Sequence, residues 1–338
     1  MEKNKKLVTL GEIMLRLKSP ENTRLFQNGL LEATFGGAEA NVAVSVSLLG
    51  GKASFLTAVP DNPMGRAALS ELNRYGVETD GCVLSADGRL GIYYLEAGSC
   101  MRPSVVTYDR SYSAFSLAAP ESFSFEDAFS DADWFHVTGI TPAVSATAAE
   151  LALTAEKAAK TAGLTVSVDL NYRKKLWKYG KSAPEVMTEL VKYADVVFSN
   201  EEDIQLSLGI MPEFKGDYRV LTAEVKKRFP SVKMVAVTRR ESFSADKNGW
   251  SACLDGTCGY IESEKYMIED IVDRVGAGDA FTAGMIFALK KDYSEEDALN
   301  FAVASSALKH TIPGDFNLST FKEVSALAAG NSSGRVQR

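Results

Sequence analysis

The sequence predicts an α/β protein with a mostly parallel central sheet and a small separate β lid. Short valine-rich runs alternate with segments of helical periodicity along most of the 338 residues. Such continuous apolar runs are typical of strands covered on both faces, and strand–helix alternation builds βαβ units. Two regions, about 13–34 and 83–116, interrupt the alternation. We expect one domain over residues 1–330, with the lid formed by these two insertions.

The individual elements follow from local patterns. We expect strands at 7–10, 53–59, 134–140, 164–170, 196–199 and 232–238. We expect helices at 38–49, 64–75 and 145–162, the last two ended by Gly76 and Gly163. Within the second insertion, 91–95 and 104–108 have the mixed faces of antiparallel strands, which could instead extend an edge of the main sheet. Residues 331–338 lack an apolar pattern and are expected to form a disordered tail.

Composition excludes several classes of protein. Lys and Arg number 37 against 44 Asp and Glu, which gives a net charge of −7 and argues against binding to nucleic acid or anionic membranes. No apolar run approaches the ~20 residues that cross a bilayer, and no secretory signal is recognisable. The four cysteines form no CxxC pair, and only two histidines are present. We therefore expect a cytoplasmic protein with reduced thiols and small-molecule partners.

The strongest motif is Asp-Arg-Val-Gly-Ala-Gly-Asp at 273–279. Apolar residues at helical spacing follow it, so the glycine turn opens a helix near Asp279. Backbone N–H groups at a helix start bind anions, and Gly276, Ala277 and Gly278 would form an anion hole suited to phosphate. Asp279 is then placed to accept a hydroxyl proton, although it could instead be a simple N-cap. Neither a Walker A sequence nor a GxGxxG fingerprint occurs.

A second glycine pair precedes the first helix, in Phe-Gly-Gly-Ala-Glu-Ala-Asn at 35–41. The backbone of Gly36 and Gly37 and the side chain of Asn41 could bind sugar hydroxyls. The alternative is a loop glycine pair followed by an ordinary helix cap.

Together the two motifs resemble the ribokinase-like (phosphofructokinase-B type) sugar kinases over nearly the whole chain. The resemblance implies a three-layer ribokinase-like sandwich, ATP as phosphoryl donor and Asp279 as catalytic base. It also implies that Asn-Glu-Glu-Asp at 200–203 corresponds to a motif that orders Mg²⁺ through water. Asp203 stands where the family has glutamate, so the indirect metal residues are expected to be Asn200, Glu202 and Asp203.

Within that family the chain is most similar to the kinases of 2-keto-3-deoxygluconate. Asp-Leu-Asn-Tyr-Arg at 169–173 has the form DxNxR. The resemblance places Tyr93, Tyr108 and Arg110 of the lid on the substrate. Arg110 and Arg173 could neutralise a sugar-acid carboxylate, because a guanidinium offers it parallel donors. The alternative for each arginine is a surface ion pair.

The resemblance also implies a set of ATP-binding residues: Asn171, Asn200, Thr238, Arg240, Gly276 and Gly278. We expect the strand to end at Thr238, after which Arg239 and Arg240 stand in place of the glycine turn common in the family. Many members also bind a monovalent cation. Arg274 and Val275 replace their threonine, so this cation is left open.

The expected reaction is transfer of phosphate from Mg-ATP to 2-keto-3-deoxygluconate, giving the 6-phosphate. The sequence does not distinguish gluconate- from galactonate-derived acids. The alternatives are a kinase of a neutral sugar such as fructose, a nicotinamide dehydrogenase, for which the sequence has no support, and a non-catalytic sugar sensor. We expect a homodimer paired through the lid, because open strand edges are usually covered.

Overall fold

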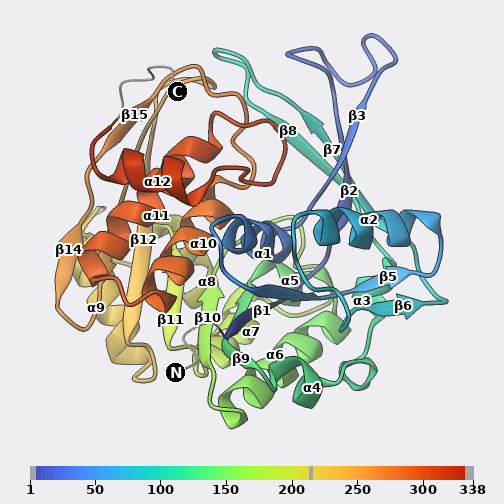
Figure 1. Cartoon of the computed structure of the whole chain (residues 1–338), viewed down its shortest axis with the longest axis horizontal. Coiled ribbons are helices and arrows are strands. Elements are labelled where there is room, and N and C mark those ends of the chain that lie inside the picture. Colours follow the sequence, from blue (N-terminus) through green and yellow to red (C-terminus); the bar gives the residue numbers. More distant parts are fainter. Residues whose placement is uncertain (1–4, 213–215, 332–338) are drawn as a thin grey trace.

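The computed structural model describes residues 5–212 and 216–331. Its main sheet has the strand order β14-β13-β12-β11-β10-β9-β1-β4, with β15 beside β13 (Figure 1). The strands are β1 (Lys6–Leu10), β4 (Ala53–Leu56), β9 (Ala132–Thr138), β10 (Thr165–Asp169), β11 (Val196–Ser199), β12 (Met234–Ser242), β13 (Asn248–Asp255), β14 (Tyr260–Glu262) and β15 (Tyr266–Ile268). Pairing is parallel from β4 to β12 and antiparallel around β13.

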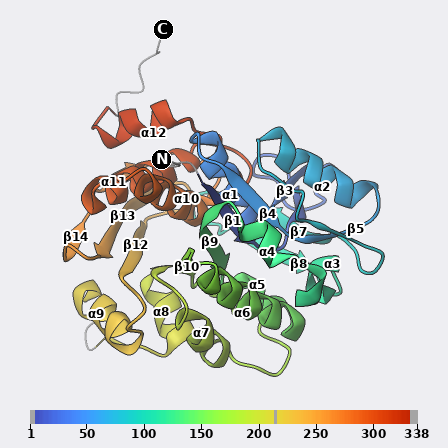
Figure 2. The ribbon, with the colours of Figure 1, turned by 60° about the horizontal axis from the view of Figure 1, so that its bottom comes forward.

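Helices cover both faces of this sheet, as Figure 2 shows. One layer contains α1 (Ala38–Leu48), α10 (Ala277–Lys290), α11 (Glu295–Lys309) and α12 (Phe321–Ala328), with α2 (Pro63–Arg74) beside them. The other contains α4 (Phe125–Phe129), α6 (Ala146–Thr161), α7 (Ala183–Val191), α8 (Glu201–Leu208) and α9 (Tyr218–Arg228). Separate apolar cores fill the two interfaces, one around Phe55 and Phe281 and the other around Phe135 and Val197. The predicted three-layer α/β fold is confirmed.

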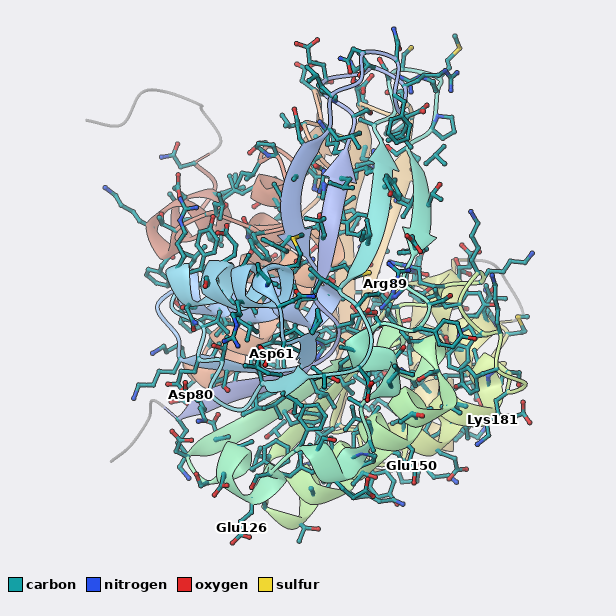
Figure 3. All side chains as sticks on the ribbon, turned by 90° about the vertical axis from the view of Figure 1, so that its right-hand side faces the viewer. Asp61, Asp80, Arg89, Glu126, Glu150 and Lys181 are labelled. Carbon is teal, nitrogen blue, oxygen red and sulfur yellow. The ribbon has the colours of Figure 1, made fainter. Side chains whose placement is uncertain are left out.

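A separate four-stranded sheet rises from the main domain, as Figure 3 shows from the side. Its order is β3-β2-β7-β8, from β3 (Glu32–Gly36), β2 (Met14–Lys18), β7 (Gly91–Glu96) and β8 (Val105–Asp109). We call it the small sheet. Its inner face packs Met14, Tyr93 and Leu95 against Tyr108 and Val106. These strands do not extend an edge of the main sheet.

Three details differ from the sequence-based expectations. The run 53–59 forms two strands, of which β5 (Ala58–Pro60) pairs with β6 (Val83–Ser85) in a two-stranded sheet. The segment around Ile140 belongs to α5 (Ile140–Val144), and α3 (Ala114–Leu117) packs on α6, away from the small sheet. Strand β12 continues past Thr238 because β13 pairs with it as far as Ser242.

The remaining features bear on function only indirectly. No helix within residues 5–212 and 216–331 combines the length and apolar character needed to span a membrane. All four cysteines are free. The expected disordered tail lies, from residue 332 on, outside the described residues.

Candidate active site

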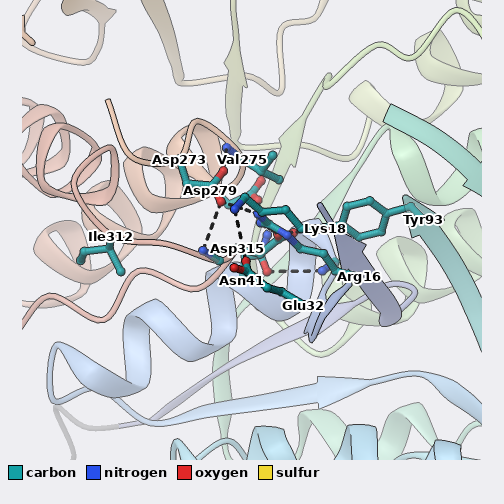
Figure 4. Close-up of polar contacts among 12 residues, drawn as sticks. Arg16, Lys18, Glu32, Asn41, Tyr93, Asp273, Val275, Asp279, Ile312 and Asp315 are labelled. Atoms are coloured by element: carbon teal, nitrogen blue, oxygen red, sulfur yellow. Dashed lines mark hydrogen bonds and ion pairs between the residues drawn. The ribbon is translucent and has the colours of Figure 1, made fainter. Parts of the chain in front are cut away.

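The two glycine turns meet beyond the carboxyl ends of the parallel strands. Asn41, in the first turns of α1, donates from Nδ2 to Oδ2 of Asp279 at 2.6 Å (Figure 4). Helices α1 and α10 pack against each other, which brings these side chains together. The turns need glycine: a Cβ on Gly37 would lie 2.1 Å from the carbonyl oxygen of Glu12, and one on Gly36 would lie 2.2 Å from Asp315 Oδ2.

Asp279 is buried at the start of α10 and does not cap it. Gly276 holds the N-cap position in the left-handed region, at φ 83°, where a side chain would be strained. The helix start therefore faces the site as backbone, with Ala277 and Gly278 in its first turn. Burial raises the pKa of Asp279 to about 7, and the charge of Asp315 adds to this effect. The hydrogen bond from Asn41 and the charge of Arg173 oppose the rise.

Two further carboxyl groups lie near Asp279. Burial raises the pKa of Asp169, at the end of β10, well above its ordinary value, and the charges of Asp203 and Asp279 raise it further. Burial also raises the pKa of Asp203 to about 6. Asn200 caps α8, with its Oδ1 accepting from the Asp203 N–H at 2.8 Å and its Nδ2 donating to Asp203 Oδ2 at 2.9 Å. Glu202 is exposed, so Asp203 is the inward carboxylate of this motif.

These carboxylates suit a magnesium ion that is held indirectly. Carboxylate oxygens are the donors that Mg²⁺ prefers, and a nearby cation would relieve the mutual repulsion of Asp169, Asp203 and Asp279. Within residues 5–212 and 216–331, no group of three or more His, Cys, Asp or Glu side chains forms a ready metal cage. Mg²⁺ usually keeps several of its waters and is held by one or two carboxylates, which this donor set can supply.

A buried ion network joins the small sheet to the glycine turn of α10. Arg16 on β2 donates from Nη1 to Asp315 at 2.5 Å and from Nη2 to Asp273 (Figure 4). Tyr93 on β7 donates its hydroxyl to the same Asp315 oxygen at 2.6 Å. The ammonium of Lys309 is buried beside these carboxylates and donates to the Ile312 carbonyl at 3.0 Å.

Sequence reasoning missed Arg16 and Asp315. Asp315 had one local signal, the Pro-Gly-Asp turn after a helix rich in small residues. Arg16 had none, because it lies in a polar stretch whose partners are 257 and 299 positions away.

The two arginines expected at the substrate occupy different places. Arg110 is buried and pairs with Glu12, its Nε lying 2.8 Å from Oε2, while its guanidinium lies 5.6 Å from the centre of the Tyr108 ring. The surface ion pair considered as an alternative is therefore wrong for Arg110. Arg173 is exposed and donates to the Tyr172 carbonyl at 3.0 Å. Its charge acts on Asp203 and Asp279, so it lies on the side of the base.

The residues expected at ATP lie along the neighbouring strand ends. Asn171 has a left-handed backbone, φ 34°, and its N–H donates to Asp169 at 3.2 Å. Thr238 donates to the Ser199 carbonyl at 3.3 Å. Arg240 is exposed within β12 and is not on a turn as expected, and its neighbour Arg239 pairs with Glu262 at 3.0 Å.

The tips of two hairpins, β7–β8 and β12–β13, contact each other. The N–H of Cys100, between β7 and β8, donates to Asp246 Oδ2 at 2.7 Å, and the N–H of Ala245 donates to the Cys100 carbonyl at 2.7 Å. Asp246 and Ala245 lie between β12 and β13. Arg274 donates from Nε to the Ala245 carbonyl at 2.8 Å, which connects this contact to the glycine turn of α10.

Comparison with known proteins matches this chain to one family. The model of the pfkB family carbohydrate kinases matches residues 4–319. The chain belongs to the pfkB family of carbohydrate kinases. A family member from Haloferax volcanii, named 2-dehydro-3-deoxygalactonokinase, is 37% identical over 97% of this chain and 98% of its own. The solved structure of 2-dehydro-3-deoxygluconokinase from Thermotoga maritima is 43% identical, with a TM-score of 0.92 over 97% of this chain and all of that one.

Proteins named as fructokinases are also similar to this chain. A fructokinase from Vibrio alginolyticus is 29% identical over 81% of each chain. The site of this pfkB kinase brings together what phosphoryl transfer needs: a buried carboxylate, a helix N-terminus with small residues, and further acidic groups for a metal ion.

Proposed function

We propose that this pfkB kinase phosphorylates a keto-deoxy sugar acid, 2-keto-3-deoxygluconate or its galactonate isomer, at the terminal hydroxyl with ATP. The observation that carries the proposal is the convergence of Asn41 and Asp279 from two distant glycine turns. The names of the similar proteins from Haloferax and Thermotoga support the class of acceptor.

In this proposal Asp279 is the general base. The terminal hydroxyl of the acid lies between Asp279 and the γ-phosphate, and its proton passes to the Asp279 carboxylate as the oxygen attacks phosphorus. The bond from phosphorus to the ADP oxygen breaks, and the backbone at Gly276, Ala277 and Gly278 stabilises charge on the transferred group. Asn41 keeps the base oriented, while the backbone of Gly36 and Gly37 binds hydroxyl groups of the acceptor.

The remaining predicted residues take supporting roles in the same proposal. Tyr93, Tyr108 and Arg110 contact the acid from the small sheet. Asn171, Asn200, Thr238 and Arg240 bind ATP. Arg173, which the sequence predicts at the substrate, acts in this proposal between Asp279 and the transferred phosphate, because its charge acts on Asp279 and Asp203. Asn200 and Asp203 would hold Mg²⁺ through water, with Glu202 outside. An ion held there would supply positive charge to the phosphate oxygens.

One observation favours a neutral acceptor as a second candidate. The guanidinium of Arg110 is already paired with Glu12, so this arginine alone brings no net charge to a carboxylate. A similar protein is a fructokinase.

The test is ADP release from Mg-ATP with 2-keto-3-deoxygluconate, 2-keto-3-deoxygalactonate and fructose as acceptors, with product masses recorded. We expect kcat/KM for one of the two acids to exceed that for fructose at least tenfold. Equal or faster turnover of fructose would favour the neutral-sugar candidate. No ADP release with any acceptor, despite sugar binding, would favour a sensor. Repeating the assay with and without K⁺ shows whether the activity depends on a monovalent cation.

We further propose a cytoplasmic homodimer that pairs through the small sheets. The face of the sheet opposite Tyr93 carries Leu17, Ile92 and Tyr94, which share one side by strand register and are only half-buried. A second copy of this face would cover them. Light scattering should give twice the chain mass, and Leu17→Lys should give the monomer.

A further inference from the structure

A cavity of about 290 Å³ lies between the small sheet and the segment that follows β10. Its walls are Val106, Thr107, Tyr108, Arg110 and Ser111 on one side and Val144, Lys175, Leu176 and Lys178 on the other. Three of these side chains are cationic and none is acidic. Tyr108 and Arg110 are also residues that the sequence predicts at the acceptor, whereas Lys175 and Lys178 are not among the predicted site residues.

Arg110 offers this cavity a donor but little net charge. Its Nε and Nη2 atoms both donate to Glu12, and both side chains are buried, so the carboxylate offsets the guanidinium charge. Its remaining nitrogen, Nη1, is buried without a hydrogen-bond partner among the described residues. Arg110 is 6% exposed, and a buried donor without a partner costs free energy. An acceptor oxygen of a ligand would satisfy Nη1.

Lys175 and Lys178 supply the charge that Arg110 cannot. Both are exposed, and neither has a carboxylate partner within residues 5–212 and 216–331. Ammonium groups of unpaired lysines attract anions over distances set by ionic strength. The cavity therefore has in its lining one buried guanidinium with an unpartnered nitrogen and two exposed ammonium groups.

We propose that Lys175 and Lys178 form the carboxylate end of the acceptor site and set the preference for a sugar acid over a neutral sugar. This inference rests on the proposed function. A six-carbon acid has its carboxylate at C1 and the reacting hydroxyl at C6. When the hydroxyl lies at Asp279, the carboxylate extends toward the small sheet, where Arg110 Nη1 donates to one oxygen.

The same assignment separates Arg173 from carboxylate binding. The charge of Arg173 acts on Asp279 and Asp203, at the end of the site where phosphate is transferred. Arg173 then serves the phosphoryl group, and the two lysines discriminate between acceptors.

The test compares the double variant Lys175→Gln/Lys178→Gln with Lys174→Gln, which removes an exposed neighbouring lysine outside the cavity. Calorimetry with 2-keto-3-deoxygluconate and no ATP gives Kd, and ADP release gives kcat and KM. In the double variant, Kd and KM for the acid should rise roughly ten- to hundredfold, as for lost charge-assisted bonds. The value of kcat should be unchanged, because the carboxylate is bound equally well in the ground state and in the transition state.

Measurements with fructose and with added salt distinguish a specific role of the two lysines in acid binding from a general loss of activity. The KM for fructose should change less than about twofold in the double variant, and added NaCl should weaken acid binding more in the wild type than in the double variant. An unchanged KM for the acid, or equal losses for acid and fructose, would overturn the role of the lysines and leave the kinase intact. Failure of the wild type to phosphorylate any sugar acid would instead overturn the proposed function.

Discussion

Asn41 Nδ2 lies 2.6 Å from Asp279 Oδ2, and this bond joins side chains 238 positions apart. It opposes the effect of burial on the Asp279 carboxyl, because a donated hydrogen bond favours the charged form and burial favours the neutral one. The resulting pKa of about 7 suits a general base that works near neutrality.

Replacement of the base gives the most direct prediction. Asp279→Asn keeps the size of the side chain but cannot accept the hydroxyl proton. We expect kcat to fall by about 10²–10⁴ while KM for the acceptor changes little, the range typical of a lost general base. The ADP-release assay measures both constants. Turnover within a few-fold of wild type would remove Asp279 from this role.

The pH profile follows from the same carboxyl group. Only the deprotonated form accepts a proton, so kcat/KM should decline as the pH falls through about 7, roughly tenfold per unit below it. Asn41→Ala removes a hydrogen-bond donor that lowers the pKa of Asp279. In this variant kcat/KM should therefore begin to fall at a higher pH than in the wild type, and activity should be partly regained in alkaline buffer. If kcat/KM of the variant and of the wild type fall at the same pH, Asn41 does not affect the pKa of Asp279.

The acidic motif at the start of α8 contains two neighbouring carboxylates in different environments. Asp203 is buried and bonded to Asn200, while Glu202 faces solvent. Asp203→Asn should raise the Mg²⁺ concentration needed for half-maximal rate by roughly 10- to 100-fold, the usual loss for a residue that supports a metal indirectly. Glu202→Gln is the matched control and should change this Mg²⁺ concentration less than about twofold. A larger change in Glu202→Gln than in Asp203→Asn would indicate that Glu202, not Asp203, supports the metal ion.

Arg16 should be essential for stability. Arg16→Met leaves the buried carboxylates of Asp273 and Asp315 with only the Lys309 ammonium beside them, and loss of a buried ion-pair partner costs about 3–5 kcal/mol of unfolding free energy. The control is Lys18→Met on the same strand, where a pair with the exposed Glu32 at 3.2 Å contributes about 0–1 kcal/mol. Urea unfolding measures both. Similar values for the two variants would mean that the network is not stabilising.

Replacement of Glu156 on α6 should increase the stability of the protein, in contrast to replacement of Arg16. Its side chain is buried with neither oxygen hydrogen-bonded, and burial raises its pKa well above the ordinary value. Folding therefore becomes less favourable as pH rises above about 4.5, because only the unfolded chain releases this proton freely. Glu156→Leu should raise the melting temperature by several degrees at pH 8 and by less at pH 5.

The exposed Glu150 on the same helix, labelled in Figure 3, provides the comparison. Glu150→Leu should change the melting temperature little at either pH, since surface substitutions rarely matter. A loss of stability in Glu156→Leu would indicate that the carboxyl has a partner in solution.

Sequence patterns were sufficient for features with a local cause. The valine-rich strands, the glycine that ends α2 and the glycine turn before Asp279 each carry their own signal over a few residues. The end of β12 was misplaced because pairing with β13 decides it, and no residue near Thr238 encodes that pairing locally.

Buried charge pairs were beyond local patterns. Glu12 and Arg110 are 98 positions apart, and no local pattern in the sequence indicates that they pair. Their pairing depends on how the small sheet sits on the main domain. The same holds for Arg16 with Asp315, and for the cavity that Lys175 and Lys178 share with Arg110.

The hairpin contact at Cys100 shows that the small sheet is held to the main domain unequally at its two ends. At its base the attachment is the buried ion network of Arg16, and at its tip the Cys100 backbone donates to the Asp246 carboxylate and accepts from the Ala245 N–H. The tip bonds are neutral or singly charged and weaker than the buried ion network. The position of the small sheet over the glycine turn of α10 is therefore fixed mainly from its base, and a substitution at the tip should leave that position unchanged.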